Sequence, residues 1–382
     1  MSRKIKKEEK AASKERKTKK EVKAAINEKI TLVFKREELE GALKTAQDFV
    51  EKKHSISALR CVRITTEADP VAGTNAVLSV TDFTASWTKR IECVGSFADV
   101  CVPAELLYRE VKALGEDVES VTLSIEGNTV SVNDRCAILT QDSKDFPEIQ
   151  SVEGVSIEIK GIAEKLARVA DVASDEEYRH NINGVFFDFK NGKVVATDGH
   201  RIHLEDMDAT EDSGFIIPKK AALIAVKHST GDDIRVGKKT VSFDVCGGVM
   251  VVRLIDGEFP DYLKVVPSDN PVRVEFMAKS LLDIFEGALP FAEGSMKMVR
   301  LTINGSITVE TSAQSLGSYK WQIPCMSFGK GKSDIEIGFN AAYLADALKA
   351  FAKDGAGVLE LKDPGSPVLV NGKAVVMPMR LS

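Results

Sequence analysis

The sequence lacks the segments that would insert it into a membrane or export it. No apolar run reaches about 18 residues, the length needed for a transmembrane helix. Residues 1–10 contain no apolar stretch like that of a secretory signal, and their lysines and glutamates do not match the composition of a transit peptide. The six cysteines include no C-x-x-C pair, so we expect free thiols. These absences predict a cytoplasmic protein that has no membrane partner.

Charge is distributed unevenly along the chain. Residues 1–28 contain 11 Lys/Arg and 5 Glu, whereas the whole sequence has a net charge of −5. The acidic remainder argues against a protein that coats DNA non-specifically, although it leaves room for a local basic surface. Residues 1–28 also contain almost no large apolar side chains, which predicts a disordered basic extension. Such an extension either contacts phosphates or another acidic surface, or it only aids solubility.

The strongest pattern is a sixfold repeat in a chain whose 382 residues suggest two to three domains. In each copy, a short stretch of alternating apolar residues runs directly into an amphipathic helix. The copies start near Ile30, Gly95, Val155, Asp212, Val272 and Ser333, about 60 residues apart. Two or three strand-like stretches follow each start, so every copy predicts β-α-β-β-β. This order indicates an α+β fold and excludes a doubly wound parallel sheet.

A coarser repeat groups these copies in pairs. Similar Phe-Pro segments, D-F-P-E-I at 145–149 and E-F-P-D-Y at 258–262, end the first and second pairs. They predict three domains at 29–150, 151–270 and 271–382. Each predicted helix has one apolar stripe that must pack on a sheet, for example Leu39, Leu43 and Phe49 in the first copy and Leu344, Leu348 and Phe351 in the last. The opposite faces of six such helices could line one continuous surface.

Four local motifs accompany the repeat. They are R-H-N-I-N-G-V at 179–185, A-T-D-G-H-R at 196–201, L-I-D-G-E-F-P-D-Y at 254–262 and V-V-M-P-M-R-L at 375–381. Together with the sixfold repeat, they resemble the bacterial sliding clamps, the beta subunits of DNA polymerase III, over residues 29–382. The first domain is the least typical, because the segment at 54–60 lacks the proline common in that loop of the family.

The resemblance implies a DNA clamp fold, with three domains in a crescent and two crescents closed head to tail into a ring. Such a homodimer encircles double-stranded DNA without sequence preference and acts as a processivity factor. The implied partners are the DNA polymerase III alpha subunit, the clamp loader and other proteins that carry clamp-binding peptides. No catalysis, cofactor or metal is expected. Whether the chain serves a chromosome, a plasmid or a virus stays open.

The resemblance also implies two kinds of surface contact. Basic residues on or near the repeated helices would face DNA inside the ring: Lys53, Lys112, Lys165, Arg168, Arg179, Lys219 and Lys220. The dimer interface would join Pro290 and Phe291 of the third domain to an edge strand of the first domain near Cys136 and Ile138.

A peptide pocket is implied between the second and third domains. Its walls would be Ile182, Thr197, Gly199, His200, Arg201, Ile202, Pro260, Lys264, Val265, Val375, Met377, Pro378 and Met379. Methionine thioethers suit a cavity that accepts several different apolar anchors. Lys264 stands where many members of the family have arginine.

An alternative function is a metal-dependent DNA-modifying enzyme built on Asp198 and His200. The stretch T-D-G-H-R-I-H at 197–203 contains candidate ligands. However, the sequence offers no distant group of ligands that would clearly complete the site. In an extended strand, residues 198, 200 and 202 share one face and His203 points to the other. A Thr-Asp-Gly turn between two strands is therefore favoured over a catalytic site.

Overall fold

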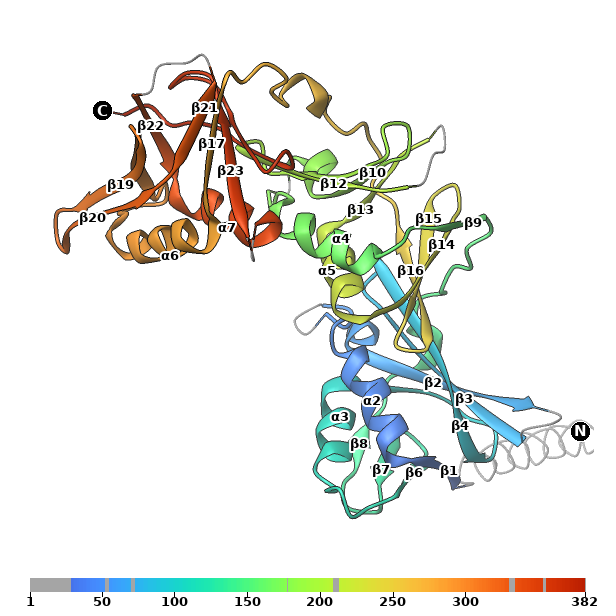
Figure 1. The fold of residues 1–382 in the computed structure, drawn as a ribbon. Helices are drawn as coiled ribbons and strands as arrows, with labels where there is room; N and C mark the ends of the chain where they lie inside the picture. The colour runs from blue at the N-terminus through green and yellow to red at the C-terminus, as the bar shows by residue number, and fades with distance from the viewer. Residues whose placement is uncertain are drawn as a thin grey trace, which may run out of the picture. The chain divides into compact units, whose positions relative to one another are not determined.

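The computed structural model describes residues 29–51, 55–69, 73–176, 178–208, 213–329, 334–352 and 355–381 (Figure 1). In this part of the chain, a strand leads into a helix six times, as the repeat predicts. The pairs are β1 (Ile30–Lys35) and α2 (Arg36–Ala46), β5 (Asp99–Pro103) and α3 (Ala104–Lys112), β9 (Val155–Glu158) and α4 (Ile162–Val169), β13 (Phe215–Pro218) and α5 (Lys219–His228), β17 (Val272–Met277) and α6 (Ala278–Ala288), and β22 (Ile335–Asn340) and α7 (Ala341–Phe351). The predicted basic extension at 1–28 and Lys53 lie outside the described residues.

Further strands follow each helix. They are β2 (Cys61–Asp69), β3 (Gly73–Thr81) and β4 (Ala85–Gly95); β6 (Ser120–Glu126), β7 (Thr129–Val132) and β8 (Ile138–Leu139); β10 (Gly184–Asp188), β11 (Lys193–Thr197) and β12 (Arg201–Asp206); β14 (Ser229–Val236), β15 (Thr240–Val245) and β16 (Gly248–Arg253); β18 (Met298–Ile303), β19 (Ser306–Ala313), β20 (Gly317–Pro324) and β21 (Met326–Gly329); and β23 (Ala356–Leu361), β24 (Val368–Val370) and β25 (Ala374–Val376). The predicted β-α-β-β-β order is thus confirmed for five copies. In the described part of the fifth copy, the extended segment is interrupted at Cys325. A fourth strand, β21, therefore follows β20.

The chain divides into two compact units, Met1–Gly154 with Arg235–Val252 and Val155–Ile234 with Arg253–Ser382. The three-domain division predicted from the sequence stays a prediction. In the first unit, neighbouring strands follow the order β8-β7-β6-β1-β4-β16-β15. A branch leaves this path at β4, where β3 pairs with β4, β2 pairs with β3 and β5 pairs with β2. Its core includes Trp87, which is fully buried, stacks on Phe49 and donates a hydrogen bond to the carbonyl of Val245 at 3.0 Å.

The second unit contains a nine-stranded sheet in the order β13-β10-β11-β12-β25-β24-β23-β17-β21 and a four-stranded sheet in the order β20-β19-β18-β22. The antiparallel pairing of β12 with β25 joins segments about 170 residues apart in the sequence into one sheet. The predicted pocket residues lie around this pairing.

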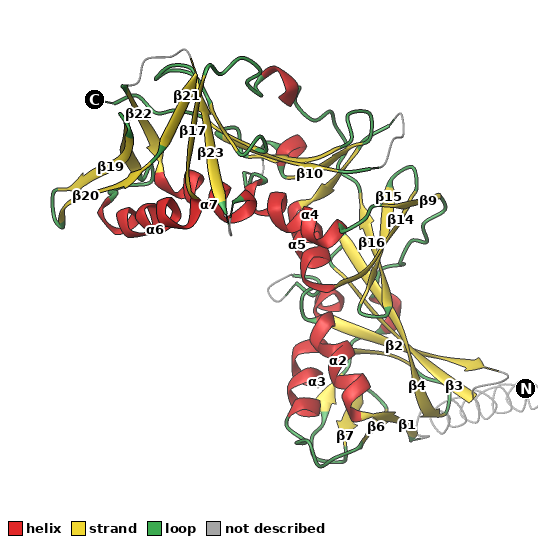
Figure 2. Cartoon of the chain, in the orientation of Figure 1, coloured by secondary structure: helices red, strands yellow, loops and turns green. Residues whose placement is uncertain are grey.

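Four helices of the second unit form a row. Helix α5 packs beside α4, α4 beside α7, and α7 beside α6 (Figure 2). Their apolar faces are buried, as Leu344 and Leu348 of α7 show with 1% exposure each. Within this unit, the structure therefore gives the continuous helical surface that the repeat suggested.

Local contacts explain where two of these helices begin. The Asn340 side chain accepts a hydrogen bond from the backbone N–H of Ala342 and caps α7. Helix α4 follows Gly161, and the Asp232 carboxylate accepts hydrogen bonds from Gly161 and Ile162 at its start. One expected position differs: α2 ends at Ala46, so the buried Phe49 belongs to the following turn rather than to the helical stripe.

Candidate functional site

The last strand of the chain lies directly beside the T-D-G-H-R segment. Arg201 is paired with Val376 and Ile202 with Val375, and the N–H of Met377 donates a hydrogen bond to the carbonyl of His200 at 3.0 Å. The register therefore brings together the two longest runs of predicted pocket residues.

An apolar cluster lies on this part of the sheet. It consists of Val195, Ile202, Leu204, Tyr262, Leu369 and Val375, with Phe186, Phe259 and Val266 packed against it. Phe259 stacks on Phe186 with ring centroids 5.0 Å apart, and the Tyr262 hydroxyl donates a hydrogen bond to Asp188 at 2.8 Å. Burial, followed by the adjacent Asp188 carboxylate, raises the pKa of Tyr262 far above its usual range. The Phe-Pro segment is thus fixed firmly to the sheet.

The predicted pocket residues fall into two groups. Ile182, Thr197, Ile202 and Val375 are buried, so they shape the site from beneath. Gly199, His200, Pro260, Lys264, Val265 and Met377 are exposed, and Arg201, Pro378 and Met379 are half-buried. The ammonium of Lys264 forms an ion pair with Asp261 at 2.9 Å, which raises its pKa.

A pocket of about 380 Å³ opens beside His200, Met377, Pro378 and Met379. Its other lining residues, which the sequence did not predict, are Ser295, Met296, Asn340 and Tyr343. The rings of His200 and Tyr343 stack with centroids 6.4 Å apart. The start of α7 thus supplies one wall, and the capping position of Asn340 was the only feature of the sequence that could have pointed to it. The volume lies in the range typical of ligand pockets.

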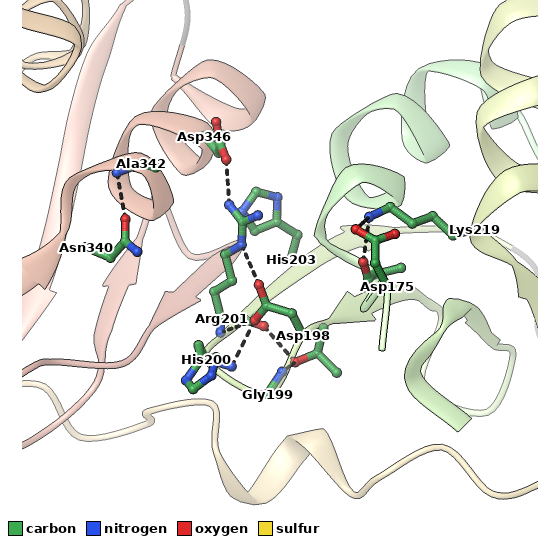
Figure 3. A network of polar contacts seen from close by, with 12 residues as sticks. Asp175, Asp198, Gly199, His200, Arg201, His203, Lys219, Asn340, Ala342 and Asp346 are labelled. Carbon is green, nitrogen blue, oxygen red and sulfur yellow. Dashed lines mark hydrogen bonds and ion pairs between the residues drawn. The ribbon is translucent and has the colours of Figure 1, made fainter. Parts of the chain in front are cut away.

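A polar network fixes the loop at 198–201 (Figure 3). The Asp198 carboxylate accepts hydrogen bonds from the backbone N–H groups of His200 at 2.9 Å and Arg201 at 3.0 Å. The Arg201 guanidinium donates to Asp198 at 3.0 Å and to Asp346 of α7 at 2.6 Å, and it lies 4.4 Å from the centre of the Tyr343 ring. Gly199 has a φ of +89°, which favours glycine. Arg201 therefore joins the loop to the helical wall of the pocket.

Within β12, His203 points to the face that packs on α7, as Arg201 does, whereas Ile202 points into the apolar cluster. Asp198 and His200 precede the strand, so the predicted alternation does not extend to them. His203 is 1% exposed, its Nδ1 lies 2.8 Å from the carbonyl of Arg168, and its ring meets Phe351 edge-on. Burial lowers the pKa of His203 to about 4. Asp198, His200 and His203 do not converge on a shared point, and no group of three or more His, Cys, Asp or Glu within the described ranges could hold a metal ion. The geometry thus gives the enzymatic alternative no support.

The predicted DNA-facing residues of the second unit lie on or next to its row of helices. Lys165 donates to the carbonyl of Asp206 at 2.6 Å, and Arg168 forms an ion pair with Glu205 at 3.0 Å. Lys219 forms one with Asp175 at 2.9 Å (Figure 3). Each cation is thus held in place by an acidic or carbonyl oxygen nearby.

The other three predicted DNA-facing residues that the structure describes, two in the second unit and one in the first, have different surroundings. Arg179 donates to the carbonyl of Asp198 at 3.3 Å and pairs with Glu176, so it supports the pocket loop. Lys220 lies in the first turn of α5. Lys112 is exposed at the end of α3 in the first unit, 5.8 Å from the centre of the Tyr108 ring.

The predicted dimer residues lie at or near sheet edges. In the first unit, β8 ends the path of strands, but Ile138 is only 5% exposed whereas Leu139 is 63% exposed. The available apolar side chain is therefore Leu139, while Cys136 is half-buried. In the second unit, Phe291 is half-buried against Tyr319 and Pro290 is exposed. Trp321, which the sequence analysis missed, is 61% exposed on β20 at the edge of the four-stranded sheet.

Comparisons with known proteins agree with this architecture. Family models for the DNA polymerase III beta subunit match residues 156–261 as its central domain and 263–380 as its C-terminal domain, more than half of the chain together. The beta sliding clamp of Caulobacter vibrioides is 28% identical over 380 residues, which cover 92% of this chain and 100% of that protein. The beta sliding clamp of Pseudomonas aeruginosa is 26% identical, covering 91% and 98%.

Solved structures give the same result. The beta sliding clamp of C. crescentus matches with a TM-score of 0.82 and 25% identity, covering 93% of this chain and 100% of that one. The DNA polymerase III beta subunit of Thermotoga maritima has the same fold, with a TM-score of 0.81 at 23% identity and coverage of 92% and 100%. Among the described residues, we find no helix with both the length and the apolar character to cross a membrane. The chain belongs to the family of DNA polymerase III beta subunits, the beta sliding clamps.

Proposed function

We propose that this chain is a DNA polymerase processivity factor that closes as a head-to-tail homodimer around double-stranded DNA. The observation that carries this proposal is the row α5-α4-α7-α6, in which neighbouring helices present one surface with repeated lysines and arginines. Such side chains contact phosphates without reading bases. A closed ring needs only weak contacts of this kind, because its retention on DNA is topological.

The second element of the proposal is a site for partner peptides. The pocket beside His200 and the apolar cluster under the Phe-Pro segment lie in the same unit, and both include residues in or next to the β12–β25 pairing. The exposed Met377 and the half-buried Met379 supply flexible thioethers that can adapt to different apolar anchors. The polymerase alpha subunit, the clamp loader and other proteins with clamp-binding peptides are the proposed partners.

The third element is the dimer contact. An unpaired edge strand offers backbone N–H and C=O groups to a second chain. We place β20, with Trp321 and the nearby Phe291, against β8 of the other copy, with its exposed Leu139. The proposed ring is non-catalytic and works in the cytoplasm.

Retention of the full-length protein on DNA tests ring function. A loaded ring stays on circular DNA and slides off linear DNA, whereas a groove-binding protein treats both alike. Four lysines on the helices are changed to glutamine together: Lys112, Lys165, Lys219 and Lys220. A matched control changes four exposed lysines away from the helices: Lys144, Lys190, Lys238 and Lys239. The helix set should weaken DNA association and reduce its salt dependence by up to about 0.9 in log–log slope for each phosphate that the variant no longer neutralises.

Equal losses of DNA affinity in the two lysine sets, or equal retention on linear and circular DNA, would contradict the ring. Partner binding is tested separately, by fluorescence anisotropy with a labelled clamp-binding peptide. Met377→Ala with Met379→Ala should weaken binding about tenfold, whereas Met326→Ala, at an exposed methionine away from the pocket, should not. Unchanged affinity in the folded double variant would refute the pocket.

A further inference from the structure

A groove of about 550 Å³ crosses the sheet of the first compact unit. Its floor is a row of cross-strand partners on four neighbouring strands. Arg63 of β2 lies opposite Ser79 of β3, Ser79 lies opposite Thr88 of β4, and Thr88 lies opposite Val249 of β16. Residues 146–151 form the other wall. The groove is therefore bounded by the Phe-Pro segment that ends the first pair of repeats.

The second unit repeats this construction, and the strand registers show which residues correspond. Pro103 and Pro218 each end a strand that leads directly into a helix. Pro103 is paired with Cys61, and Arg63 lies two residues after Cys61. Pro218 is paired with Gly184, and Phe186 lies two residues after Gly184. Arg63 and Phe186 thus occupy equivalent positions in the two copies.

The rest of the row follows from the same registers. In the second unit, Phe186 lies opposite Val195, and Val195 lies opposite Leu204. This row is apolar, so Phe259 and Tyr262 of the second Phe-Pro segment pack down on it, and Tyr262 is left only 4% exposed. Burial of apolar surface closes the space between the segment and the sheet.

In the first unit, the equivalent row is Arg63, Ser79 and Thr88, which are polar. Phe146 is buried against Cys61 and Cys101. Ile149 stands where the second segment has its tyrosine, and it is only half-buried. A polar floor gives the first Phe-Pro segment little apolar surface to cover. The groove stays open at the position where the second unit is sealed.

The open groove has a defined chemical character. Val249, 44% exposed, and Val251 make one part of the floor apolar, and Ile149 faces the same space. The Arg63 guanidinium makes two hydrogen bonds of 2.9 Å to Asp99, so its charge is already compensated. Glu148 also lines the groove, is exposed and has no ion-pair partner among the residues that the structure describes. The groove therefore combines a largely polar floor, an apolar part at Val249 and Val251, and one uncompensated negative charge.

We propose that this groove is a second peptide-binding site, which takes an extended segment of a partner protein carrying a large apolar side chain next to a lysine or arginine. The apolar side chain would rest on Val249 and Val251, and the cation would pair with Glu148. The hydroxyls of Ser79 and Thr88 would accept hydrogen bonds from the peptide backbone. The inference rests on the proposed function, because the peptide pocket of the second unit is the precedent for the equivalent position here.

The test uses peptides selected from a phage-displayed random library on the full-length protein, then labelled for fluorescence anisotropy. Thr88→Trp fills the groove, and Glu148→Lys reverses the charge at its exposed edge without touching the core. Ser131→Trp places the same bulk at another half-buried hydroxyl residue of this sheet, outside the groove, and serves as the control. Met377→Ala with Met379→Ala reports on the pocket of the second unit.

We expect a class of peptides with an apolar–basic pair whose affinity falls about tenfold in Thr88→Trp and severalfold in Glu148→Lys. The same peptides should bind Ser131→Trp and the double methionine variant as they bind the wild type. A selection that yields only peptides sensitive to the methionine changes overturns the second site and leaves the pocket standing. Peptides sensitive to Glu148→Lys but none sensitive to the methionine changes would support the groove and count against the pocket. A selection that enriches no peptide affected by either groove change overturns the proposal.

Discussion

Replacing Arg201 with alanine should loosen the partner pocket and destabilise the second compact unit. The side chain is 11% exposed, bonds to Asp198 and Asp346, and packs on the Tyr343 ring. Removing one partner from a fully buried ion pair costs about 3–5 kcal/mol. Because the Asp346 side chain is 46% exposed, we expect a smaller loss, about 2–3 kcal/mol in the free energy of unfolding.

That loss should lower the Tm of the second unit by about 5–10 °C, measured by calorimetry. Affinity for a clamp-binding peptide should fall about tenfold, because the loop at 198–201 and the start of α7 lose their connection. Arg273→Ala is the matched control. Arg273 also pairs with two carboxylates, Glu275 and Glu360, but its side chain is 48% exposed, so its loss should cost about 0.5 kcal/mol and leave peptide affinity unchanged.

Two results would refute this reasoning. Equal shifts in Tm for the Arg201 and Arg273 variants would mean that burial of the guanidinium does not increase the stability gained from its ion pairs. A lowered Tm with unchanged peptide affinity would mean that the network stabilises the unit without shaping the pocket.

Three further predictions follow from other sites. Burial holds the pKa of His203 at about 4, below its usual 6.5, so the stability that comes from neutral His203 is fully present above pH 6.5 and is lost as the pH falls towards 4. The free energy of unfolding should fall by about 2 kcal/mol at pH 5, and His203→Gln should remove this change, so that its Tm is nearly constant between pH 7 and 5. Trp321→Glu should shift the protein from dimer to monomer in sedimentation at micromolar concentration, whereas Phe328→Glu, at another exposed aromatic residue, should not. Removing residues 1–28, which contain almost no large apolar side chains, should change the Tm by no more than a few degrees and weaken DNA binding only at low salt.

The repeated part of the fold could be predicted because its pattern is local. An alternating stretch that runs into an amphipathic helix needs only neighbouring residues to specify it, and all six of these starts are confirmed. A local pattern is less informative where one residue of register decides which side chain is exposed. Ile138 is a predicted dimer residue, and this stays a prediction; within the single chain the side chains of the strand alternate, so Ile138 is buried and Leu139 is exposed.

The site could be predicted only in part, because long-range pairing builds it. The motifs gave the residues on β12, the Phe-Pro segment and the last strand. They did not give Tyr343 or Met296, which reach the pocket through the packing of α7 and the segment after α6. On the sequence alone, Tyr343 is one more ring in an amphipathic helix. The packing of α7 beside β25 makes it a pocket wall, and the local sequence does not carry that packing.

The charges on the helices bear on how tightly a ring of this protein would hold DNA. Within the described ranges, cations of the helical row pair with nearby carboxylates: Arg168 with Glu205, Lys219 with Asp175, Lys279 with Asp283 and Lys349 with Glu286. A phosphate must compete with these carboxylates, so each cation contributes less to DNA affinity than its charge suggests. Glu205 is the extreme case, because burial works to raise its pKa while hydrogen bonds from Lys373 and Arg168 outweigh burial and lower it. If Arg168 moved away, the buried Glu205 would keep only Lys373 as a cationic partner, so the guanidinium donors that do not bond to Glu205 are the ones available to DNA. Contacts weakened in this way can be broken and remade at each step along the duplex, which a ring that slides requires.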